Sequence, residues 1–522
     1  MSMLVCRRGG LIVMTWVLMG LALSGCSTNP VTGESEFSLV SAAQEISIGE
    51  QQYLPSRQSQ GGDYEVDEEL TEYVNRVGQR LVAVSDRDLP YEFAVLNNGV
   101  PNAWALPGGK IALNRGLLVE LGSEAELAAV LGHEIVHAAA RHGAQAVTRG
   151  TLLQGAMVVG MIASADSEYS NLIVGGAQLG AQLINQRYGR DAEREADYYG
   201  IRYMLEAGYD PRAAVALQET FVRLSKGRSR AGWLEGLFAS HPPSQERVEN
   251  NRRLVRELAP QMEGRDLETG RERYQQAISF LKQSQPAYEL FDEARQEITD
   301  DDLEQAFVKL REAQKMVPRE ARFVGLQGDI LLHQGRYREA VQTYDRALSL
   351  DSGYFDYYLG RGVAYSRLGS RDLARQDLEK STELLPTAVG MNELGKIALN
   401  AGNTAEARQY FQAAASGQGE VSQQARQAFV RLDIPENPGT YIQARPFLER
   451  GGRLYARVSN GTRLDLQSVV VDFVAATDEG TARQTRVLRT LPAGASVNVD
   501  SGITLQDARQ QVDVRIREAQ AR

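Results

Sequence analysis

The stretch 128-AAVLGHEIVHAAARH-142 contains three of the five histidines of the chain, and two of them, His133 and His137, are four residues apart. Residues at this spacing share one face of a helix, so both imidazoles can bind the same ion, as zinc sites of the HExxH type require. Residues 123–148 are expected to form one helix that runs through these histidines. Apolar neighbours such as Val130 and Ile135 predict that this helix is largely buried, where unpaired imidazoles and a carboxylate would be costly without a partner. We therefore predict a metal site rather than a surface helix with scattered polar residues.

Glu134 follows the first of these histidines and is predicted to be the general base. A zinc ion brings the pKa of its bound water near neutrality, and a carboxylate base makes that water a nucleophile for an amide carbonyl. A catalytic zinc also needs a third protein ligand and an open position. His142 comes five residues after His137, off the ligand face, and is expected to be a helix-end histidine outside the site. The third ligand is therefore expected to be a carboxylate from a second helix, with 193-EREAD-197 as the candidate, although such a cluster alone is usually a solvated helix face.

The N-terminus predicts a secreted protein. A short basic start precedes an apolar run of 13 residues, Leu11 to Leu23, which is short for a membrane span but typical of a secretory signal. The sequence 23-LSGC-26 resembles a bacterial lipobox, which implies cleavage before Cys26 and attachment to a membrane through lipid on Cys26. Plain signal cleavage and a retained anchor are the alternatives. Ser27, where some lipoproteins have Asp, resembles the pattern of lipoproteins sorted to the outer membrane.

Length and composition exclude several classes of protein. A chain of 522 residues is too long for one hydrophobic core, so two to four domains are expected. Its 43% hydrophobic and 24% charged residues are typical of a soluble globular protein. The net charge of -10 is spread along the chain without a basic stripe, which argues against nucleic-acid binding. Cys6 lies inside the predicted signal, so the mature chain has no second cysteine to pair with Cys26.

An internal repeat follows the predicted metal site. Gly328, Gly362 and Gly395 are 34 and 33 residues apart. Alanines and further glycines keep the same spacing, at Ala340, Ala374 and Ala407 and at Gly335, Gly369 and Gly402. This pattern resembles tetratricopeptide repeats (TPRs), in which small residues let paired helices pack closely. The stacked pairs are expected to form a concave surface for peptides or proteins.

The rest of the chain completes the predicted domain organisation. An apolar, Gly/Ala-rich segment at 150–184 is expected to form a buried or lid-like helical hairpin. Short strands near 454–458, 469–475, 486–491 and 512–518 predict a small β-sandwich with a capping or docking role. The predicted parts are a lipoprotein signal at 1–25, a tether at 26–38, a metalloprotease domain at 39–260, a TPR domain at 271–430 and a C-terminal β domain at 440–522.

The pairing of HExxH with ExxxD on a later helix resembles the HtpX/BepA branch of the prenyl-protease-type zinc metallopeptidases, in the gluzincin group. The resemblance implies a zincin-like α+β protease domain with one zinc ion per chain, so the whole chain is expected to be multidomain and mainly α. It implies that Glu193 is the third ligand. It also implies that Asp197, one turn later, holds a histidine or an arginine in place, while Glu195 points away.

The same family has a downstream His-Pro followed by Arg, which corresponds to 240-SHPPSQER-247. The resemblance implies that His241 can bind the zinc as a fourth ligand and block the water. We hypothesise that His241 is a self-inhibitory ligand, and the alternative is an ordinary His-Pro turn at a helix start. Arg247 is predicted either to orient Asp197 or to stabilise the developing oxyanion.

The family also has an Asn-Ala-aromatic-Ala segment before the HExxH helix, which here is Asn102, Ala103, Trp104 and Ala105. The resemblance implies an edge strand that pairs with the substrate backbone by β-addition. A core hairpin with Trp104 packed inside is the alternative, and both can hold.

These observations predict a zinc metalloendopeptidase of the bacterial periplasm, lipid-anchored to the outer membrane. By resemblance, its substrates would be misfolded or stalled envelope proteins. The repeats would dock on these clients or on the outer-membrane β-barrel assembly machinery. The alternative is a TPR chaperone or scaffold for outer-membrane assembly with a latent protease.

Overall fold

The computed structural model describes residues 26–154, 184, 188–226, 240–477, 480–507 and 510–522. The chain divides into two compact units, Met1–Pro386 and Thr387–Arg522, each of which is described by itself. The predicted signal and most of the predicted hairpin at 150–184 lie outside the described residues. Among the described helices, none is long and apolar enough to cross a membrane.

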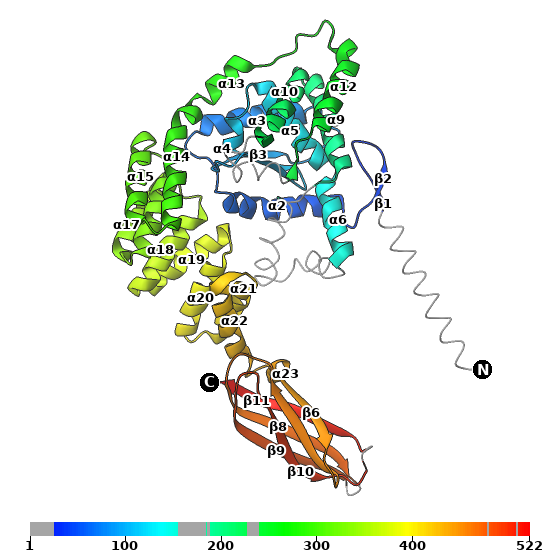
Figure 1. Ribbon diagram of the computed structural model, residues 1–522, viewed down its shortest axis with the longest axis vertical. Helices are drawn as coiled ribbons and strands as arrows, with labels where there is room; N and C mark the ends of the chain where they lie inside the picture. The colour runs from blue at the N-terminus through cyan, green and yellow to red at the C-terminus, as the bar shows by residue number, and fades with distance from the viewer. Residues whose placement is uncertain (1–25, 155–183, 185–187, 227–239, 478–479, 508–509) are drawn as a thin grey trace, which may run out of the picture. The chain divides into compact units, whose positions relative to one another are not determined.

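A three-stranded sheet lies within the first unit, in the order β3 (Glu92–Leu96), β5 (Lys110–Asn114), β4 (Ala103–Leu106). β5 runs parallel to β3 and antiparallel to β4, so β4 is an edge strand. Alternate side chains enter different cores. Those on one face pack with α3 (Glu68–Val82) and α5 (Glu124–Ala139), and those on the other pack with α2 (Ala42–Ser59) and α6 (His142–Gln154). Figure 1 shows α2 below the sheet and α3 and α5 above it. The short helix α4 (Arg115–Leu118) follows β5 directly.

α5 packs closely against α9 (Arg190–Glu206), and α10 (Arg212–Lys226) and α12 (Gln245–Met262) complete this layer. Two glycines allow the close approach of α5 and α9. A methyl group at Gly200 would lie 3.0 Å from the backbone nitrogen of His133, and one at Gly132 would lie 3.1 Å from the carbonyl oxygen of Gly200. The crossing therefore brings the acidic first turns of α9 beside the two histidines of α5.

The helix predicted over 123–148 is in fact two helices. α5 ends at Ala139, and Arg141 adopts a positive φ of 66°, so the chain turns before α6 begins at His142. Non-glycine residues adopt such angles only when the surroundings hold them there. Arg141 is buried, pairs with Glu45 and donates a hydrogen bond to the carbonyl of Val40 at 2.7 Å. The prediction of one continuous helix is wrong because these contacts stabilise a break that the apolar pattern does not reveal.

The segment predicted to be a tether is folded. β1 (Cys26–Thr28) and β2 (Ser35–Phe37) form an antiparallel hairpin. Asn29 is fully buried, and Val31 belongs to the same hydrophobic core as α3 and α5. The expectation of a simple spacer at 26–38 is therefore wrong, because this segment has an apolar anchor and a buried amide that pack on the protease fold.

The repeat region consists of helix pairs, as the TPR pattern predicts. In the first unit these helices are α13 (Arg271–Ala277), α14 (Ser279–Thr299), α15 (Leu303–Met316), α16 (Ala321–His333), α17 (Tyr337–Leu350), α18 (Phe355–Leu368) and α19 (Arg371–Leu384). The second unit begins with α20 (Ala388–Asn400), α21 (Thr404–Ala415) and α22 (Gly419–Asp433). A methyl group at Gly328 would lie 2.6 Å from the Tyr344 ring, and one at Gly395 would lie 2.7 Å from the Phe411 ring. The repeated glycines therefore do make room for a large side chain of the paired helix.

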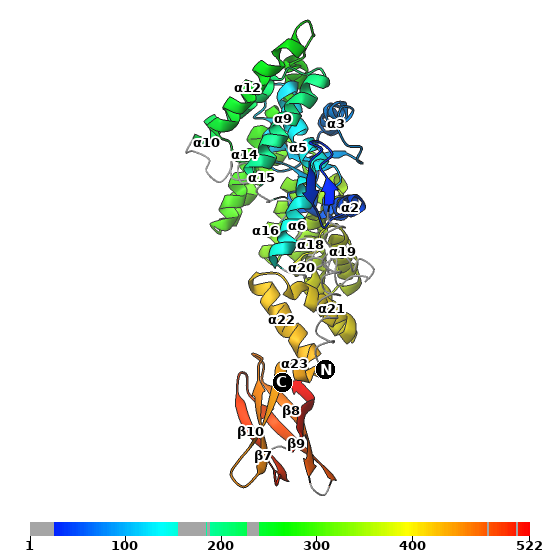
Figure 2. The ribbon, with the colours of Figure 1, turned by 90° about the vertical axis from the view of Figure 1, so that its right-hand side faces the viewer.

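The second unit ends in a β domain that follows the short helix α23 (Pro438–Tyr441). Its six strands are β6 (Ile442–Leu448), β7 (Arg453–Asn460), β8 (Leu466–Thr477), β9 (Gly480–Leu491), β10 (Ser496–Thr504) and β11 (Val512–Ala521). They form two antiparallel sheets, β10-β7-β6 and β11-β8-β9, around one shared core (Figure 2). The mainly helical multidomain fold with a small C-terminal β-sandwich is confirmed, and β6 and β10 are strands that the sequence did not predict.

Candidate metal centre

Four side chains from three elements converge at one buried point. His133 and His137 come from α5, Glu193 comes from the first turn of α9, and His241 precedes α12. One ligand atom of each residue can be chosen so that all four lie within 4.8 Å of one another. Nε2 of His133 and Nε2 of His137 are 3.1 Å apart, and Nδ1 of His241 is 2.9 Å from Oε1 of Glu193.

This donor set fits a divalent metal ion. Nε2 of His133 faces ring nitrogens of both His137, at 3.1 Å, and His241, at 3.3 Å. Three imidazoles that point their nitrogens at one another beside a carboxylate compete for the same few protons, whereas one cation satisfies all of them. Nitrogen and carboxylate donors together are typical of zinc, and two nitrogens each about 2.0 Å from one ion are separated by about the distance found here.

Glu134 lies beside the cluster and is almost fully buried. Its Oε1 is 3.6 Å from Nε2 of His241, and its Oε2 has no hydrogen-bond partner among the described residues. Burial raises the pKa of the Glu134 carboxyl above its ordinary value. A carboxylate that is poorly solvated and incompletely paired is a stronger proton acceptor than one in water.

Asp197 and Arg247 form a buried pair beside His133. Arg247 donates from Nε and Nη2 to the two oxygens of Asp197, at 2.8 and 2.7 Å, and its Nη1 is 2.9 Å from Oε2 of Glu193. Oδ1 of Asp197 is 3.1 Å from Nδ1 of His133. Burial would raise the pKa of Asp197, but the charge and hydrogen bonds of Arg247 outweigh it and lower the pKa to about 2. Asp197 is therefore ionised and contacts both a histidine and an arginine.

His142 begins α6 and is not one of the four clustered residues, as expected, but it contacts one of them. Its Nδ1 is 2.8 Å from Nδ1 of His137, on the side of that ring opposite the cluster. The break at Arg141 explains this contact, because spacing along one helix no longer applies after the chain turns. Glu195 points away from the cluster as expected, but its Oε1 is 3.5 Å from Nε2 of His142.

Tyr188 is a further residue of the site that the sequence did not indicate. Its ring stacks on His137, with ring centroids 4.0 Å apart and an interplanar angle of 24°. Burial lowers the pKa of His137 well below its ordinary value, so that its imidazole is neutral, the form that binds metals.

The predicted substrate strand and lipidation site belong to the same unit as the cluster. Ala103, Trp104 and Ala105 belong to edge strand β4, and Asn102 precedes it; all four are buried. The Trp104 ring packs edge to face against Tyr53, so its side chain is in the core, as the alternative interpretation has it. Cys26 begins β1. Pairing of β4 with a substrate and lipidation of Cys26 stay predictions.

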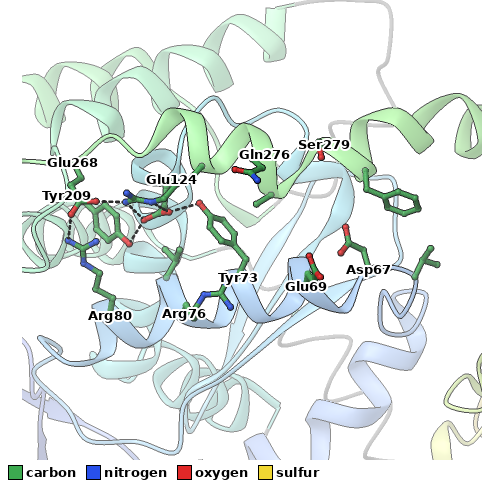
Figure 3. Close-up of a pocket in the computed structure, with 15 residues that line it drawn as sticks. Asp67, Glu69, Tyr73, Arg76, Arg80, Glu124, Tyr209, Glu268, Gln276 and Ser279 are labelled. Atoms are coloured by element: carbon green, nitrogen blue, oxygen red, sulfur yellow. Dashed lines mark hydrogen bonds and ion pairs between the residues drawn. The ribbon is translucent and has the colours of Figure 1, made fainter.

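A cavity of about 810 Å³ lies between α3, α13 and the start of α5 (Figure 3). Glu124 lines this cavity, and its carboxylate accepts hydrogen bonds from Arg273 and from the hydroxyls of Tyr73 and Tyr209. This cavity includes none of the four clustered side chains. Its paired charges attach the N-terminus of α5 to α13.

Comparison with known proteins shows which family the residues around this cluster resemble. The model of peptidase family M48 matches residues 68–255, which contain all four clustered side chains. The chain carries a peptidase family M48 domain. Models of tetratricopeptide repeats match residues 328–369 and 356–425, which confirms the repeats.

Among curated relatives, the mitochondrial metalloendopeptidase OMA1 of Schizosaccharomyces pombe is 34% identical over 196 residues, which cover 37% of this chain and 53% of the relative. The beta-barrel assembly-enhancing protease of Escherichia coli K12 is 30% identical over 240 residues, which cover 45% and 48% of the two chains. The chain thus spans about half the length of these relatives. Among solved structures, a thermophilic TPR protein of Thermus thermophilus matches with a TM-score of 0.26 and 18% identity, over 30% of this chain and 87% of that one.

Proposed function

We propose that this protein is a zinc-dependent metalloendopeptidase. The observation that carries the proposal is the convergence of His133, His137 and Glu193 on one buried point beside Glu134. The family match and the metalloendopeptidases among the relatives support it. Each chain would bind one zinc ion, with these three residues as its ligands.

The residues around the ligands divide the chemical work. When bound, zinc activates water and polarises the carbonyl of the scissile bond. Glu134 takes up a proton as the general base, for which its unpaired Oε2 is suited. Asp197 fixes the orientation of the His133 ring, and Arg247 fixes the positions of the Asp197 and Glu193 carboxylates. This double pairing favours the orienting role of Arg247 over direct contact with an oxyanion.

We assign His241 a self-inhibitory role. Its imidazole lies among the ligands, 2.9 Å from Glu193 and 3.6 Å from Glu134, where a substrate carbonyl or water would have to enter. Displacement of His241 by a client would then open the site. The variant His241→Ala should cleave unfolded casein faster than the wild type, and activity at or below wild type contradicts inhibition.

The substrates we propose are misfolded or stalled envelope proteins in the bacterial periplasm. The E. coli relative is named a beta-barrel assembly-enhancing protease, which supports this class of client. Edge strand β4, with Asn102 to Ala105, would pair with an extended substrate by β-addition, which depends little on sequence. The repeats would dock clients or the outer-membrane β-barrel assembly machinery, and lipid on Cys26 would hold the protein at the outer membrane.

Casein cleavage tests the proposed activity. The purified protein with zinc should degrade unfolded casein, and Glu134→Gln, which keeps the size of the side chain, should lose at least about 100-fold in rate because a general base is removed. Equal cleavage by Glu134→Gln contradicts the proposal.

A TPR scaffold with a latent protease is the second candidate, and the position of His241 favours it. The two functions differ in their dependence on Glu134. If Glu134→Gln restores the growth of a deletion strain under envelope stress as well as the wild-type gene does, the scaffold function dominates. Failure of that variant to restore growth supports proteolysis.

A further inference from the structure

His137 has two ring nitrogens with different surroundings. Nε2 faces the cluster, 3.1 Å from Nε2 of His133 and 3.4 Å from Oε1 of Glu193. Nδ1 faces the other way, 2.8 Å from Nδ1 of His142. If Nε2 is the ligand atom, Nδ1 of His137 carries the proton and donates a hydrogen bond to Nδ1 of His142. Nδ1 of His142 then accepts this hydrogen bond, and Nε2 of His142 is the nitrogen that can donate, on the side of Glu195.

Glu195 continues this sequence of hydrogen bonds. Its Oε1 is 3.5 Å from Nε2 of His142 and also accepts a hydrogen bond from Nδ2 of Asn29 at 2.8 Å. The amide of Asn29 and the ring of His142 therefore both contact the carboxylate of Glu195. A carboxylate in this position selects the His142 tautomer that can accept from His137.

Asn29 is fixed by the N-terminal hairpin. Its Oδ1 accepts hydrogen bonds from the backbone nitrogens of Val31 and Thr32, at 3.0 and 3.3 Å, so its Nδ2 is directed at Glu195. Its backbone closes the turn between β1 and β2 through Glu34, at 2.8 Å. The side chain is fully buried, and Val31 beside it is in the main core. The segment just after Cys26 is therefore three hydrogen-bonding contacts from a residue of the metal cluster.

We infer that His142, Glu195 and Asn29 are positioning residues, which set the affinity of the metal centre by fixing the ring of His137. Docking of the hairpin at 26–37 thereby controls the metal centre. The inference rests on the proposed zinc site. Loss of such partners of a ligating histidine typically weakens metal affinity by about 10- to 100-fold.

The test is zinc affinity, measured by competition with a chromophoric chelator on the purified protein. Glu195→Gln keeps the size of the side chain and an oxygen that can accept from Asn29, but removes the charge that orients His142. Asn29→Ala removes the contact from the hairpin. Glu206→Gln, on the exposed side of α9, is the matched control. Glu195→Gln should bind zinc about 10-fold or more weakly, Asn29→Ala at least several-fold more weakly, and Glu206→Gln like the wild type.

Two further readouts separate positioning from general loss of structure. The visible spectrum of the cobalt-substituted protein reports the ligand geometry, and it should change in Glu195→Gln while the urea midpoint of tryptophan fluorescence stays near that of Glu206→Gln. Zinc affinity of Glu195→Gln and Asn29→Ala within twofold of wild type overturns the inference. A wild type that binds zinc but cleaves casein no faster than Glu134→Gln overturns the proposed function and leaves the affinity test valid; a wild type that binds no zinc overturns both.

Discussion

Replacement of Arg247 by methionine should destabilise the metal-free protease fold strongly. Arg247 donates two hydrogen bonds to Asp197 and contacts Glu193 at 2.9 Å. Arg247, Asp197 and Glu193 are 7%, 9% and 5% exposed, respectively. Methionine preserves most of the packing of the arginine stem but removes the charge. Two carboxylates would then stay buried without a cation, and breaking a buried pair in this way costs about 3–5 kcal/mol.

Urea denaturation followed by tryptophan fluorescence is a suitable assay. All three tryptophans, Trp16, Trp104 and Trp233, precede the repeats, so the signal does not come from the TPR or β domains. The protein is first treated with a chelator, because a bound cation would compensate the carboxylates. Arg253→Met is the matched control: Arg253 is on the same helix, is exposed and bonds only to Asn250 in its own helix among the described contacts.

The control should change the free energy of unfolding by no more than about 0.5 kcal/mol. Adding Asp197→Asn to Arg247→Met should recover part of the loss, because one of the two unpaired carboxylates is neutralised. A loss below about 1 kcal/mol for Arg247→Met, or one equal to that of Arg253→Met, refutes the view that Arg247 holds the acidic residues of the site together.

Three further predictions concern other parts of the chain. Burial, and to a smaller extent the charge of Asp356, raises the pKa of Asp329 above its ordinary value of 3.8. The folded state therefore keeps a proton that the unfolded chain loses above about pH 4. The free energy of unfolding then falls as the pH rises, by up to about 1.4 kcal/mol per pH unit. Asp329→Asn should therefore raise the urea midpoint of the helical circular dichroism signal at pH 8 and leave it unchanged near pH 4; equal effects at both pH values contradict this sign. Gly328→Ala should lose about 1–3 kcal/mol in the same assay because the methyl group meets the Tyr344 ring, whereas Gly150→Ala, whose new methyl group has no atom of the described residues within 4 Å, should be neutral or stabilising. Removal of the metal by a chelator should abolish casein cleavage and lower the melting temperature of the protease fold, and added zinc should restore both; cleavage that survives the chelator contradicts the proposed chemistry.

The sequence predicted most of the fold because its signals are local. The HExxH helix, the second helix with its acidic turn and the repeats each carry their own periodicity. The spacing of Gly328, Gly362 and Gly395 was sufficient to identify the helix pairs, since a small residue must face each large one. The strands β6 and β10 were missed, because their exposed faces break the apolar alternation.

The partners of the cluster were predictable only in part. The acidic stretch at 193–197 was only a candidate from the residues alone, and the resemblance to the HtpX/BepA-type metallopeptidases assigned the roles of Glu193 and Asp197, which lie one turn apart on α9. The contact of His142 with His137 was not predictable, because spacing along one helix places the two rings on different faces, and a positive φ at Arg141 cannot be inferred from a pattern of apolar residues. The role of Asn29 could not be predicted, because its contact with Glu195 joins residues 166 positions apart. Asn29 also lies in a segment whose polar composition favours a linker.

The most direct test of the central claim is the anomalous difference map at the zinc absorption edge, from crystals of the protein purified with zinc. We expect one peak per chain, about 2.0–2.2 Å from Nε2 of His133, Nε2 of His137 and a carboxylate oxygen of Glu193. The absence of a peak there, or a full-occupancy peak at another group of side chains, would contradict that claim.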